Sequence, residues 1–450
     1  MRILVSILKV VVALIVVAIV GLAAWLWFAP PDLIRVGTGY SAKIVCSNVF
    51  IAGRDAEEVL AVDVQAPGHP LLGFISVDVD RDAGTASAAL LGLFGKSVAI
   101  TREGLGCASV PDGDLDSART ISLPGGAVPA GAAGSWPDGE AVDPSDDPAI
   151  AAILDDPGLL GPDMRAVVVV KDGRIVAERY GEGFSAATPL LGWSMTKTVT
   201  AGIVGTLIRR GMLERDRTGL FEHWSNDERR GISLADMLAM SSGLEFNENY
   251  GDVADVTRML YLEPDMAGFA SAKPLTGAIG DTFSYSSGTT VMISRIWQDA
   301  VGDRAAALAW PREALFAPLG MSSAVMETDA VGTFVGSSYM YATARDWARY
   351  GLFLLNDGRW GGKDILPPGY VEWMREDAPA SDGAYGRGHL WKNGADNGLP
   401  EDAFWMRGHD GQSTVVIPSQ NLVVVRLGLT PSKLGYSPAP LVAALVDVLR

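Results

Sequence analysis

A serine and a lysine three residues apart are the first side chains in this sequence whose types and spacing can do covalent chemistry. Ser194 and Lys197 lie in residues 192–197, at the start of a predicted helix. Residues three apart lie on the same face of a helix, so the hydroxyl and the amine are expected to lie side by side. A lysine that burial keeps partly neutral can take the proton of such a serine, and the free N–H groups of the helix start can hold an oxyanion.

The Ser-x-x-Lys pattern is weak by itself. It also occurs at Ser6 and Lys9, inside an N-terminal apolar run where it can have no catalytic meaning. Taken alone, Ser194 is most simply a helix N-cap and Lys197 a solvated helix residue. The catalytic interpretation therefore depends on residues further along the chain.

A tyrosine and a second serine form the next group of candidate site residues. A hydrolase with a Ser–Lys pair also needs a group that moves a proton to the leaving group. Tyr285 can do so if the charge of a nearby lysine lowers its pKa. Ser287 lies two residues further on. Taken alone, Tyr285 is equally well explained as a buried core residue.

A third group, His409, Gly411 and Gln412, lies just before the penultimate predicted strand. A glycine at the start of an edge strand allows a substrate to approach the backbone closely. The backbone N–H groups of Ser194 and Gln412 can then form an oxyanion hole. Taken alone, His409 is more simply a turn or structural histidine, whereas the three groups taken jointly favour catalysis.

The elements that must position these groups come from distant parts of the chain. One helix is predicted from Ser194 to about Arg210, and another over 232–240 with Ser233 as its N-cap. Strands at both ends with helices between them indicate an α+β fold, in which one sheet is built from distant segments. The predicted strands are 165–170, 174–179, 412–417 and 422–429, and the outer helices are 148–154 and 441–450.

Three motifs in this order resemble those of the serine β-lactamase and penicillin-binding-protein superfamily: Ser-x-x-Lys, Tyr-x-Ser and His-x-Gly. The similarity is closest to class C-like enzymes, namely esterases, D-aminopeptidases and 6-aminohexanoate-oligomer hydrolases. It covers about 140–450, and the similar stretches are 192–197, 240–244, 283–288 and 407–412. The resemblance implies a β-lactamase/transpeptidase-like fold, with an antiparallel sheet beside a helical region, and a serine hydrolase that needs no metal or organic cofactor.

The resemblance also implies a role for each candidate residue. Ser194 would be the acylated nucleophile, and Lys197 would help to activate it. Tyr285 would protonate the leaving group and activate the water that removes the acyl group. Ser287 would stand where the superfamily often has Asn, and would hold Lys197 or the substrate.

Departures from the superfamily pattern concern the substrate. His409 and Gly411 occupy the strand motif in which β-lactamases and penicillin-binding proteins usually carry Lys-Thr-Gly. The lysine that would meet a β-lactam carboxylate is absent, which favours a neutral ester or amide as substrate. The loop 245–252, which contains Tyr250, could line the cleft or could be a surface loop. Trp391 could likewise line the cleft or could be a core residue.

The N-terminal part of the chain predicts a membrane anchor, with the rest of the chain on the exported, periplasmic side. Residues 10–28 carry no charge, follow Arg2 and Lys9, and are long enough to span a bilayer. An uncleaved anchor is favoured over a cleaved signal peptide, because the apolar run continues past the possible cleavage site at 21–23. The predicted order is an anchor at 1–29, a β-rich segment at 30–122, a Gly/Ala/Pro-rich linker at 123–139 and a hydrolase domain at 140–450.

The two cysteines of the chain, Cys46 and Cys107, both follow the predicted anchor. An exported segment lies in an oxidising compartment, so we predict one disulfide between them. Two independent buried thiols are the alternative.

Composition and motifs argue against several other classes. The net charge of −17 argues against a nucleic-acid partner. The four histidines, His69, His223, His389 and His409, lack metal-ligand spacing. No Gly-x-Ser-x-Gly elbow supports an α/β-hydrolase. The expected partners are a small-molecule ester or amide and the membrane.

Two other classes of function stay open. One is a penicillin-recognising binder or sensor that is acylated without efficient turnover. The other is an envelope protein that keeps the fold without the chemistry.

Overall fold

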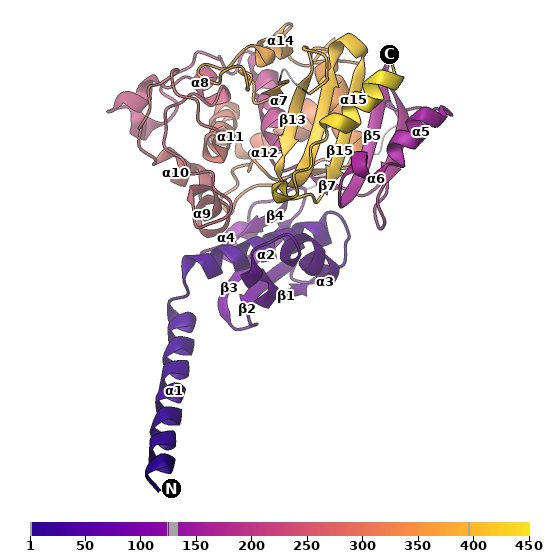
Figure 1. Ribbon diagram of the computed structural model, residues 1–450. Helices are drawn as coiled ribbons and strands as arrows, with labels where there is room; N and C mark the ends of the chain where they lie inside the picture. The colour runs from indigo at the N-terminus through magenta and orange to yellow at the C-terminus, as the bar shows by residue number, and fades with distance from the viewer. Residues whose placement is uncertain (1, 124, 126–133, 395–396) are drawn as a thin grey trace.

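The computed structural model describes residues 2–123, 125, 134–394 and 397–450. Figure 1 shows three parts in chain order: a helix that projects from the body, a small unit of helices and strands, and a large domain. The large domain holds all three predicted groups of site residues.

The large domain is built around one antiparallel sheet of six strands. Its order, β12-β13-β14-β15-β5-β6, places β15 (Leu422–Gly428) beside β5 (Met164–Lys171), so that the two ends of the domain pair directly. Valines fill both strands, as expected for strands buried on both faces. The other strands are β12 (Trp391–Lys392), β13 (Phe404–Gly408), β14 (Gln412–Ile417) and β6 (Arg174–Tyr180).

Helices cover both faces of this sheet. On one face, α13 (Ala344–Leu355) packs against β14, β15 and β5. On the other, α5 (Pro148–Leu154) and α15 (Ala439–Val448) share a core cluster with Val167 and Val169. The predicted α+β architecture, its strands and its outer helices are confirmed.

The helical region lies beside the sheet and is organised around α7 (Met195–Arg209). Every residue of α7 from Met195 to Leu207 is buried, so the helix is enclosed by the domain. The predicted N-cap Ser233 begins α8 (Leu234–Leu238) and forms a capping box with Asp236. The other helices are α6 (Pro157–Leu160), α9 (Asp255–Leu262), α10 (Met266–Ser271), α11 (Ser287–Val301), α12 (Arg304–Pro311) and α14 (Tyr370–Arg375), and the short strands are β7 (Leu190–Leu191), β8 (Val325–Met326), β9 (Met340–Ala342), β10 (Arg359–Trp360) and β11 (Lys363–Asp364).

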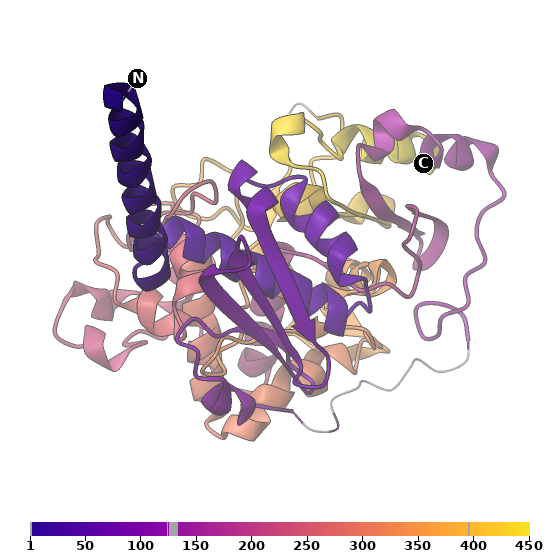
Figure 2. The ribbon, with the colours of Figure 1, turned by 90° about the horizontal axis from the view of Figure 1, so that it is seen from below.

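The small unit consists of one long helix packed on a four-stranded antiparallel sheet. Figure 2 shows α2 (Asp32–Phe50) behind the strands of this sheet, and its opposite side contacts α9 of the large domain. The strands, in spatial order, are β1 (Ile75–Asp80), β2 (Thr85–Leu90), β3 (Phe94–Arg102) and β4 (Gly106–Ser109). Shorter helical turns are α3 (Ala56–Val59), η1 (Leu60–Gln65), η2 (Pro70–Phe74) and α4 (Leu115–Arg119).

The segment predicted as β-rich therefore also contains a long helix, α2, which the prediction missed. Polar residues of α2 such as Thr38, Ser41 and Ser47 are buried along with its apolar ones. A helix covered on most of its surface has no polar stripe, so its sequence lacks the alternation that marks a surface helix. The strands predicted within 73–80 and 97–102 are present.

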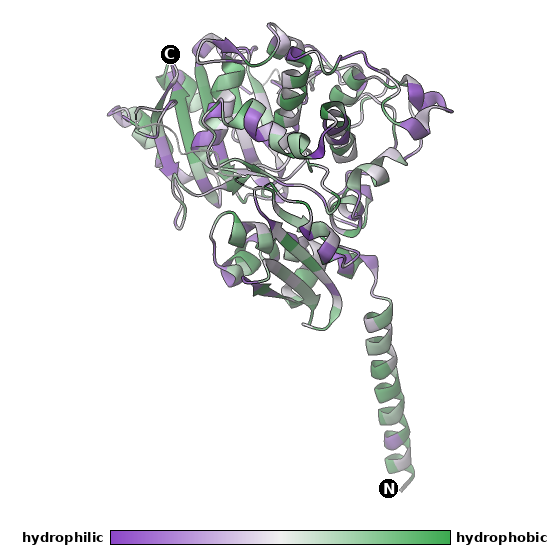
Figure 3. Cartoon of the chain, turned by 180° about the vertical axis from the view of Figure 1, so that it is seen from behind, coloured by the Kyte–Doolittle hydropathy of each residue, from purple (hydrophilic) through white to green (hydrophobic). Residues whose placement is uncertain are grey.

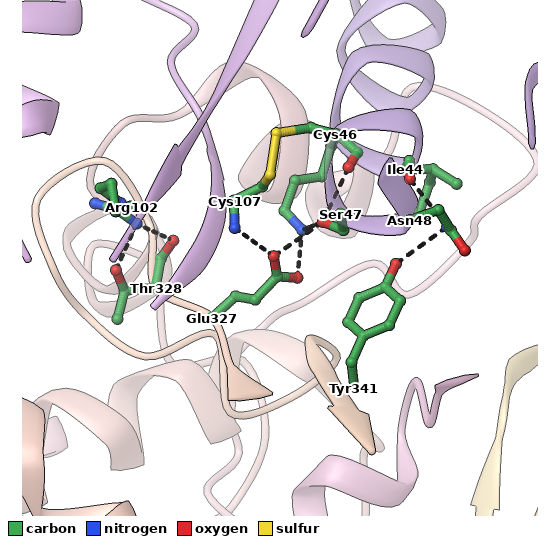
Figure 4. The surroundings of a disulfide bond; sticks show 10 residues. Ile44, Cys46, Ser47, Asn48, Arg102, Cys107, Glu327, Thr328 and Tyr341 are labelled. Atoms are coloured by element: carbon green, nitrogen blue, oxygen red, sulfur yellow. Dashed lines mark hydrogen bonds and ion pairs between the residues drawn. A yellow bond between two sulfur atoms is a disulfide. The ribbon is translucent and has the colours of Figure 1, made fainter. Parts of the chain in front are cut away.

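The predicted disulfide is present and lies beside the contact between the small unit and the large domain. Cys46 on α2 is bonded to Cys107 on β4. Figure 4 shows the carboxylate of Glu327, from the large domain, reaching towards both elements. It accepts hydrogen bonds from Lys43 Nζ at 2.6 Å, the Cys107 N–H at 2.6 Å and Ser47 Oγ at 2.9 Å. A buried ion pair therefore fixes the small unit against the large domain.

The projecting helix is α1 (Arg2–Phe28). Its stretch Ile3–Phe28 is long and apolar enough to cross a membrane, and none of its most apolar part is buried against the rest of the chain. Figure 3 shows this helix as almost continuously hydrophobic. By length and composition it is either a membrane anchor or a signal sequence.

The predicted linker at 123–139 falls partly on residues 124 and 126–133, which lie outside the described residues. Its later part is held against α13 of the large domain. Arg349 donates hydrogen bonds to the carbonyl oxygens of Pro137 at 2.9 Å and Gly139 at 2.7 Å, and it pairs with the carboxylate of Glu140. This part of the segment is an ordered loop.

Candidate active site

Ser194 lies in the sharp turn between β7 and α7. The residue before it, Trp193, has a φ of +48°, which a non-glycine side chain rarely adopts. Gly192 passes so close to the ring of Trp347 that a Cβ there would lie 2.2 Å from it. Ser194 takes the N-cap position of α7, yet its hydroxyl makes no capping hydrogen bond. The hydroxyl therefore remains available to contact another side chain.

That side chain is Lys197, one turn further along α7. Its Nζ lies 3.1 Å from Ser194 Oγ, and it also contacts Ser287 Oγ and the carbonyl oxygen of Ser337, both at 3.0 Å. The side chain is 1% exposed, and burial lowers the pKa of Lys197 to about 8. A substantial fraction of the amine is thus neutral near pH 8, as a proton acceptor for Ser194 requires.

Tyr285 approaches Ser194 from the start of α11. The Ser194 side chain interacts with the Tyr285 hydroxyl and lowers its pKa, and the Tyr285 ring lies under Lys197 Nζ, 4.6 Å from the ring centre. Trp391 packs on the same ring, with the two ring centres 5.4 Å apart, so this tryptophan supports Tyr285. We expected a lysine charge to lower the pKa of Tyr285. Instead, burial raises this pKa, so Tyr285 is a neutral phenol that can donate a proton.

Ser287, the first residue of α11, links Lys197 to a carboxylate that the sequence analysis missed. Glu248 accepts a hydrogen bond from Ser287 Oγ at 2.5 Å and another from the Ser287 N–H at 2.8 Å. The charge of Glu248 raises the pKa of Lys197, against the larger effect of burial. Glu248 belongs to the polar loop 245–252, where it has no motif spacing to Ser194, so only the fold reveals its place.

His409 and Gly411 lie in the tight turn between β13 and β14, and Gln412 is the first residue of β14, so the group stands just before the penultimate strand as predicted. The φ angles of Asp410 and Gly411 are +56° and +81°, so the chain reverses before Gln412 begins β14. A Cβ on Gly411 would lie 2.9 Å from Arg426 Nη1. The glycine is therefore needed for this turn and this contact, and the close approach of a substrate to its backbone stays a prediction.

Gly408 makes a close contact with the backbone next to the nucleophile. A Cβ on Gly408 would lie 2.2 Å from the carbonyl oxygen of Gly192. Gly408 pairs with Gln412 across the hairpin, and the Gln412 side chain is buried, with hydrogen bonds to the backbone of Gly428. The hairpin therefore lies against the turn that carries Ser194. The oxyanion role of the Ser194 and Gln412 N–H groups stays a prediction.

Three rings, which we call the aromatic wall, complete the surroundings: Trp193, Tyr250 and His409. His409 stacks on Tyr250 with ring centres 5.3 Å apart and meets Trp193 edge-on at 5.7 Å. The Tyr250 hydroxyl lies 3.4 Å from Ser287 Oγ. The wall therefore joins the predicted His409 to the Lys197 network, and Tyr250 belongs to the site and not to a surface loop.

Within the described residues, no group of three or more His, Cys, Asp or Glu side chains is placed to hold a metal ion. The arrangement instead offers a nucleophile, a partly neutral amine and a neutral phenol in mutual contact. These are the parts that acyl transfer through a covalent intermediate requires.

Comparison with known proteins gives the same picture. The family model described as Beta-lactamase matches residues 159–435. A 6-aminohexanoate-dimer hydrolase of Paenarthrobacter ureafaciens is 25% identical over 295 residues, which cover 59% of this chain and 72% of that protein.

Solved structures share the fold. A penicillin-binding-protein homologue from Caulobacter crescentus superposes with a TM-score of 0.54 at 16% identity, over 69% of this chain and 99% of its own. A family VIII carboxylesterase superposes with a TM-score of 0.53 at 15% identity, over 69% of this chain and 99% of its own. The family match begins at residue 159, so it includes neither α1 nor the small unit.

Proposed function

Because the chain belongs to the beta-lactamase family, whose members are serine hydrolases, we propose that it cleaves a small ester or amide through an acyl-enzyme on Ser194. The observation that carries this proposal is the contact of 3.1 Å between Ser194 Oγ and the buried Lys197 Nζ, whose pKa is lowered to about 8. We also propose that α1 anchors the protein in the cell membrane with the catalytic domain on the exported side. The disulfide supports an oxidising compartment.

Acylation begins when Ser194 Oγ attacks the substrate carbonyl carbon while Lys197 Nζ takes the hydroxyl proton. The N–H groups of Ser194 and Gln412 hold the negative carbonyl oxygen. When the tetrahedral intermediate collapses, the bond to the leaving oxygen or nitrogen breaks, and that atom takes the proton of the Tyr285 hydroxyl. Lys197 returns its proton to Tyr285, which restores both groups.

Deacylation uses the same groups with water as the nucleophile. As the water oxygen attacks the acyl carbon, the Tyr285 hydroxyl takes a proton from the water and passes its own proton to the neutral Lys197 Nζ, which is the base of the step. Ser194 Oγ leaves as an alkoxide and takes the proton back. The acid product departs and the resting site is restored.

The substrate preference follows from the turn at residues 409–411. His409 occupies the place at which a β-lactamase usually presents a lysine, and its ring is stacked in the aromatic wall. No group there matches a β-lactam carboxylate as a lysine would. A neutral ester or amide therefore fits better.

A substrate panel tests this proposal. With full-length protein, p-nitrophenyl butyrate and a short p-nitroanilide are compared with nitrocefin, each followed by product release and by intact mass. We expect turnover of the ester or the anilide and slow or no turnover of nitrocefin. A stoichiometric acyl adduct that persists without product would contradict turnover and support the sensor alternative.

The rate should depend on pH through Lys197. Since only the neutral amine accepts the serine proton, kcat/KM is expected to rise as the pH increases through about 8. The negative charge of Glu248 raises the pKa of Lys197. Glu248→Gln therefore moves the midpoint of this rise to lower pH.

The control for this shift is Glu245→Gln, an exposed residue of the same loop. It should leave the midpoint where the wild type has it. The measurement is kcat/KM from pH 5 to pH 10, which should rise roughly tenfold per pH unit below the midpoint. A midpoint in Glu248→Gln that is equal to or higher than that of the wild type would show that Glu248 does not raise the pKa of Lys197.

A further inference from the structure

A cavity of about 420 Å³ lies between the small unit and the large domain. This volume falls within the roughly 300–1,000 Å³ that is typical of small-molecule sites. The family match begins at residue 159, so the half of the cavity formed by α2, η2, β1 and β2 comes from a part of the chain that the match does not cover.

The two sides of the cavity differ in chemistry. The small unit contributes aliphatic side chains, among them Ile34, Val36 and Leu72. The large domain contributes the aromatic wall and the charged side chains of Asp252, Asp410 and Lys433. A ligand that suits both sides has a hydrocarbon part and a polar part, which is the composition of an amphiphile.

Two of the residues that line the cavity are direct neighbours of the catalytic group. Trp193 lines the cavity and directly precedes Ser194. Tyr250 lines it as well, and the hydroxyl of Tyr250 lies 3.4 Å from Ser287 Oγ, which in turn contacts Lys197 Nζ. A chain that fills the cavity therefore contacts the immediate neighbours of the residues that would act on a carbonyl.

The outer end of the cavity lies at the end of α1. Leu33 and Ile34 line it from the first turn of α2, directly after the apolar helix ends at Phe28. The start of β3 lies at the same place, because a Cβ on Gly95 would be 3.4 Å from Pro30 and 2.7 Å from Ile34. The mouth of the cavity thus lies where the chain would leave a bilayer.

Exposed apolar side chains continue from this mouth. We call them the apolar rim: Leu33, Leu71, Phe74, Leu91 and Leu93. The N–H of Leu91 donates a hydrogen bond to the carbonyl oxygen of Phe74, which holds the two parts of the rim together. An exposed apolar patch beside a membrane-spanning helix indicates contact with lipid.

We propose that the substrate is a membrane amphiphile, an ester or amide whose hydrocarbon chain enters from the bilayer, passes the apolar rim and lies in this cavity with its carbonyl at Ser194. This proposal rests on the proposed function and adds the class of substrate to it. It also gives the small unit a task, which is to form the aliphatic wall of the chain-binding cavity. The buried pair Lys43–Glu327 keeps that wall in place against the large domain.

Chain-length dependence tests the proposal. Full-length protein in phosphatidylcholine vesicles is assayed with p-nitrophenyl esters from butyrate to dodecanoate. Each methylene that moves from water into an apolar site favours binding about fourfold. We therefore expect kcat/KM to rise along the series until the cavity is full. A series without such a rise would overturn the proposal.

Variants distinguish binding of the ester chain in the cavity from general partitioning of long esters into the vesicles. Ile34→Glu and, at the rim, Leu33→Glu place a carboxylate on the path of the chain, so the ratio of the dodecanoate to the butyrate rate should fall towards one. Val331→Glu, an exposed apolar residue of the large domain outside the cavity, should keep the wild-type ratio. Because Leu33 is exposed, its variant is expected to fold even if Ile34→Glu does not. An equal ratio in all variants would contradict the proposal.

Three further outcomes show which part of the proposal fails. If a rise with chain length is just as large without vesicles, the chain comes from solution and the membrane source is wrong. If butyrate is hydrolysed without any chain preference, the proposed hydrolase stands and the amphiphile does not. If no ester is hydrolysed and Ser194 does not react with a fluorophosphonate, the proposed function itself fails.

Discussion

Replacing Ser194 with alanine is expected to lower kcat for ester hydrolysis by a factor on the order of 10⁴ or more, because nothing else in the site can form the acyl-enzyme. The substitution removes one oxygen that contacts Lys197 and Tyr285 and makes no capping hydrogen bond to α7. The fold should therefore persist, with an unchanged circular dichroism spectrum. The measurement is steady-state kinetics with p-nitrophenyl butyrate.

The chain contains its own control for this substitution. Ser6 and Lys9 repeat the Ser-x-x-Lys pattern on the apolar helix α1, away from the domain that carries the site. Ser6→Ala should leave kcat and KM unchanged. If Ser194→Ala kept more than a small fraction of the wild-type kcat, another nucleophile would have to be sought.

The second large effect is expected on stability, from Glu327→Ala. The carboxylate of Glu327 is fully buried and accepts hydrogen bonds from Lys43, Ser47 and the Cys107 N–H. Removing it leaves a lysine without its counter-charge in the contact between the small unit and the large domain. Breaking a buried ion pair in this way typically costs about 3–5 kcal/mol. The free energy of unfolding of the full chain in detergent, followed by denaturant titration, should fall by that order.

A surface ion pair provides the matched comparison. Asp447 and Arg450 form a pair in which both side chains are about 70% exposed. Asp447→Ala should change the free energy of unfolding by less than about 1 kcal/mol, because water screens exposed charges. An effect of Glu327→Ala no larger than this would show that the two parts of the protein are held together by other contacts.

The sequence predicted the centre of the site because its signals are local. Ser194 and Lys197 are one helical turn apart, so helix geometry alone places their side chains together. The valine-rich strands and the Asp-Gly turn between β5 and β6 likewise depend on near neighbours in the sequence. The pairing of β15 with β5 joins strands that are far apart in the sequence. It was still predictable, because strands at the two ends of one domain have few other partners in a single sheet.

What the sequence did not reveal depends on contacts between distant segments. Glu248 reaches Ser287 across 39 positions of sequence, and only the folded loop brings them together. The helix α2 is hidden because it is covered on most sides, which removes the polar stripe that would mark it. The close contact of Gly408 with the Gly192 backbone also joins distant segments, and nothing in the sequence marked Gly408 for it.

The pKa values of the site illustrate the same limit. A lysine beside a tyrosine predicts a lowered tyrosine pKa from charge alone. In the structure, Lys197 Nζ lies over the ring face of Tyr285 and the phenol is buried, so desolvation is the largest effect on the Tyr285 pKa and raises it. The same burial lowers the pKa of Lys197, which leaves the amine as the base and the phenol as the acid.

The central claim is that Ser194 is an activated nucleophile, and covalent labelling tests it most directly. Full-length wild type and Ser194→Ala are incubated with a fluorophosphonate probe, and their intact masses are measured, followed by peptide mapping. The account predicts one probe adduct on the wild type, located on Ser194, and no adduct on the variant. An unlabelled wild type, or an adduct that maps to another residue, would contradict it.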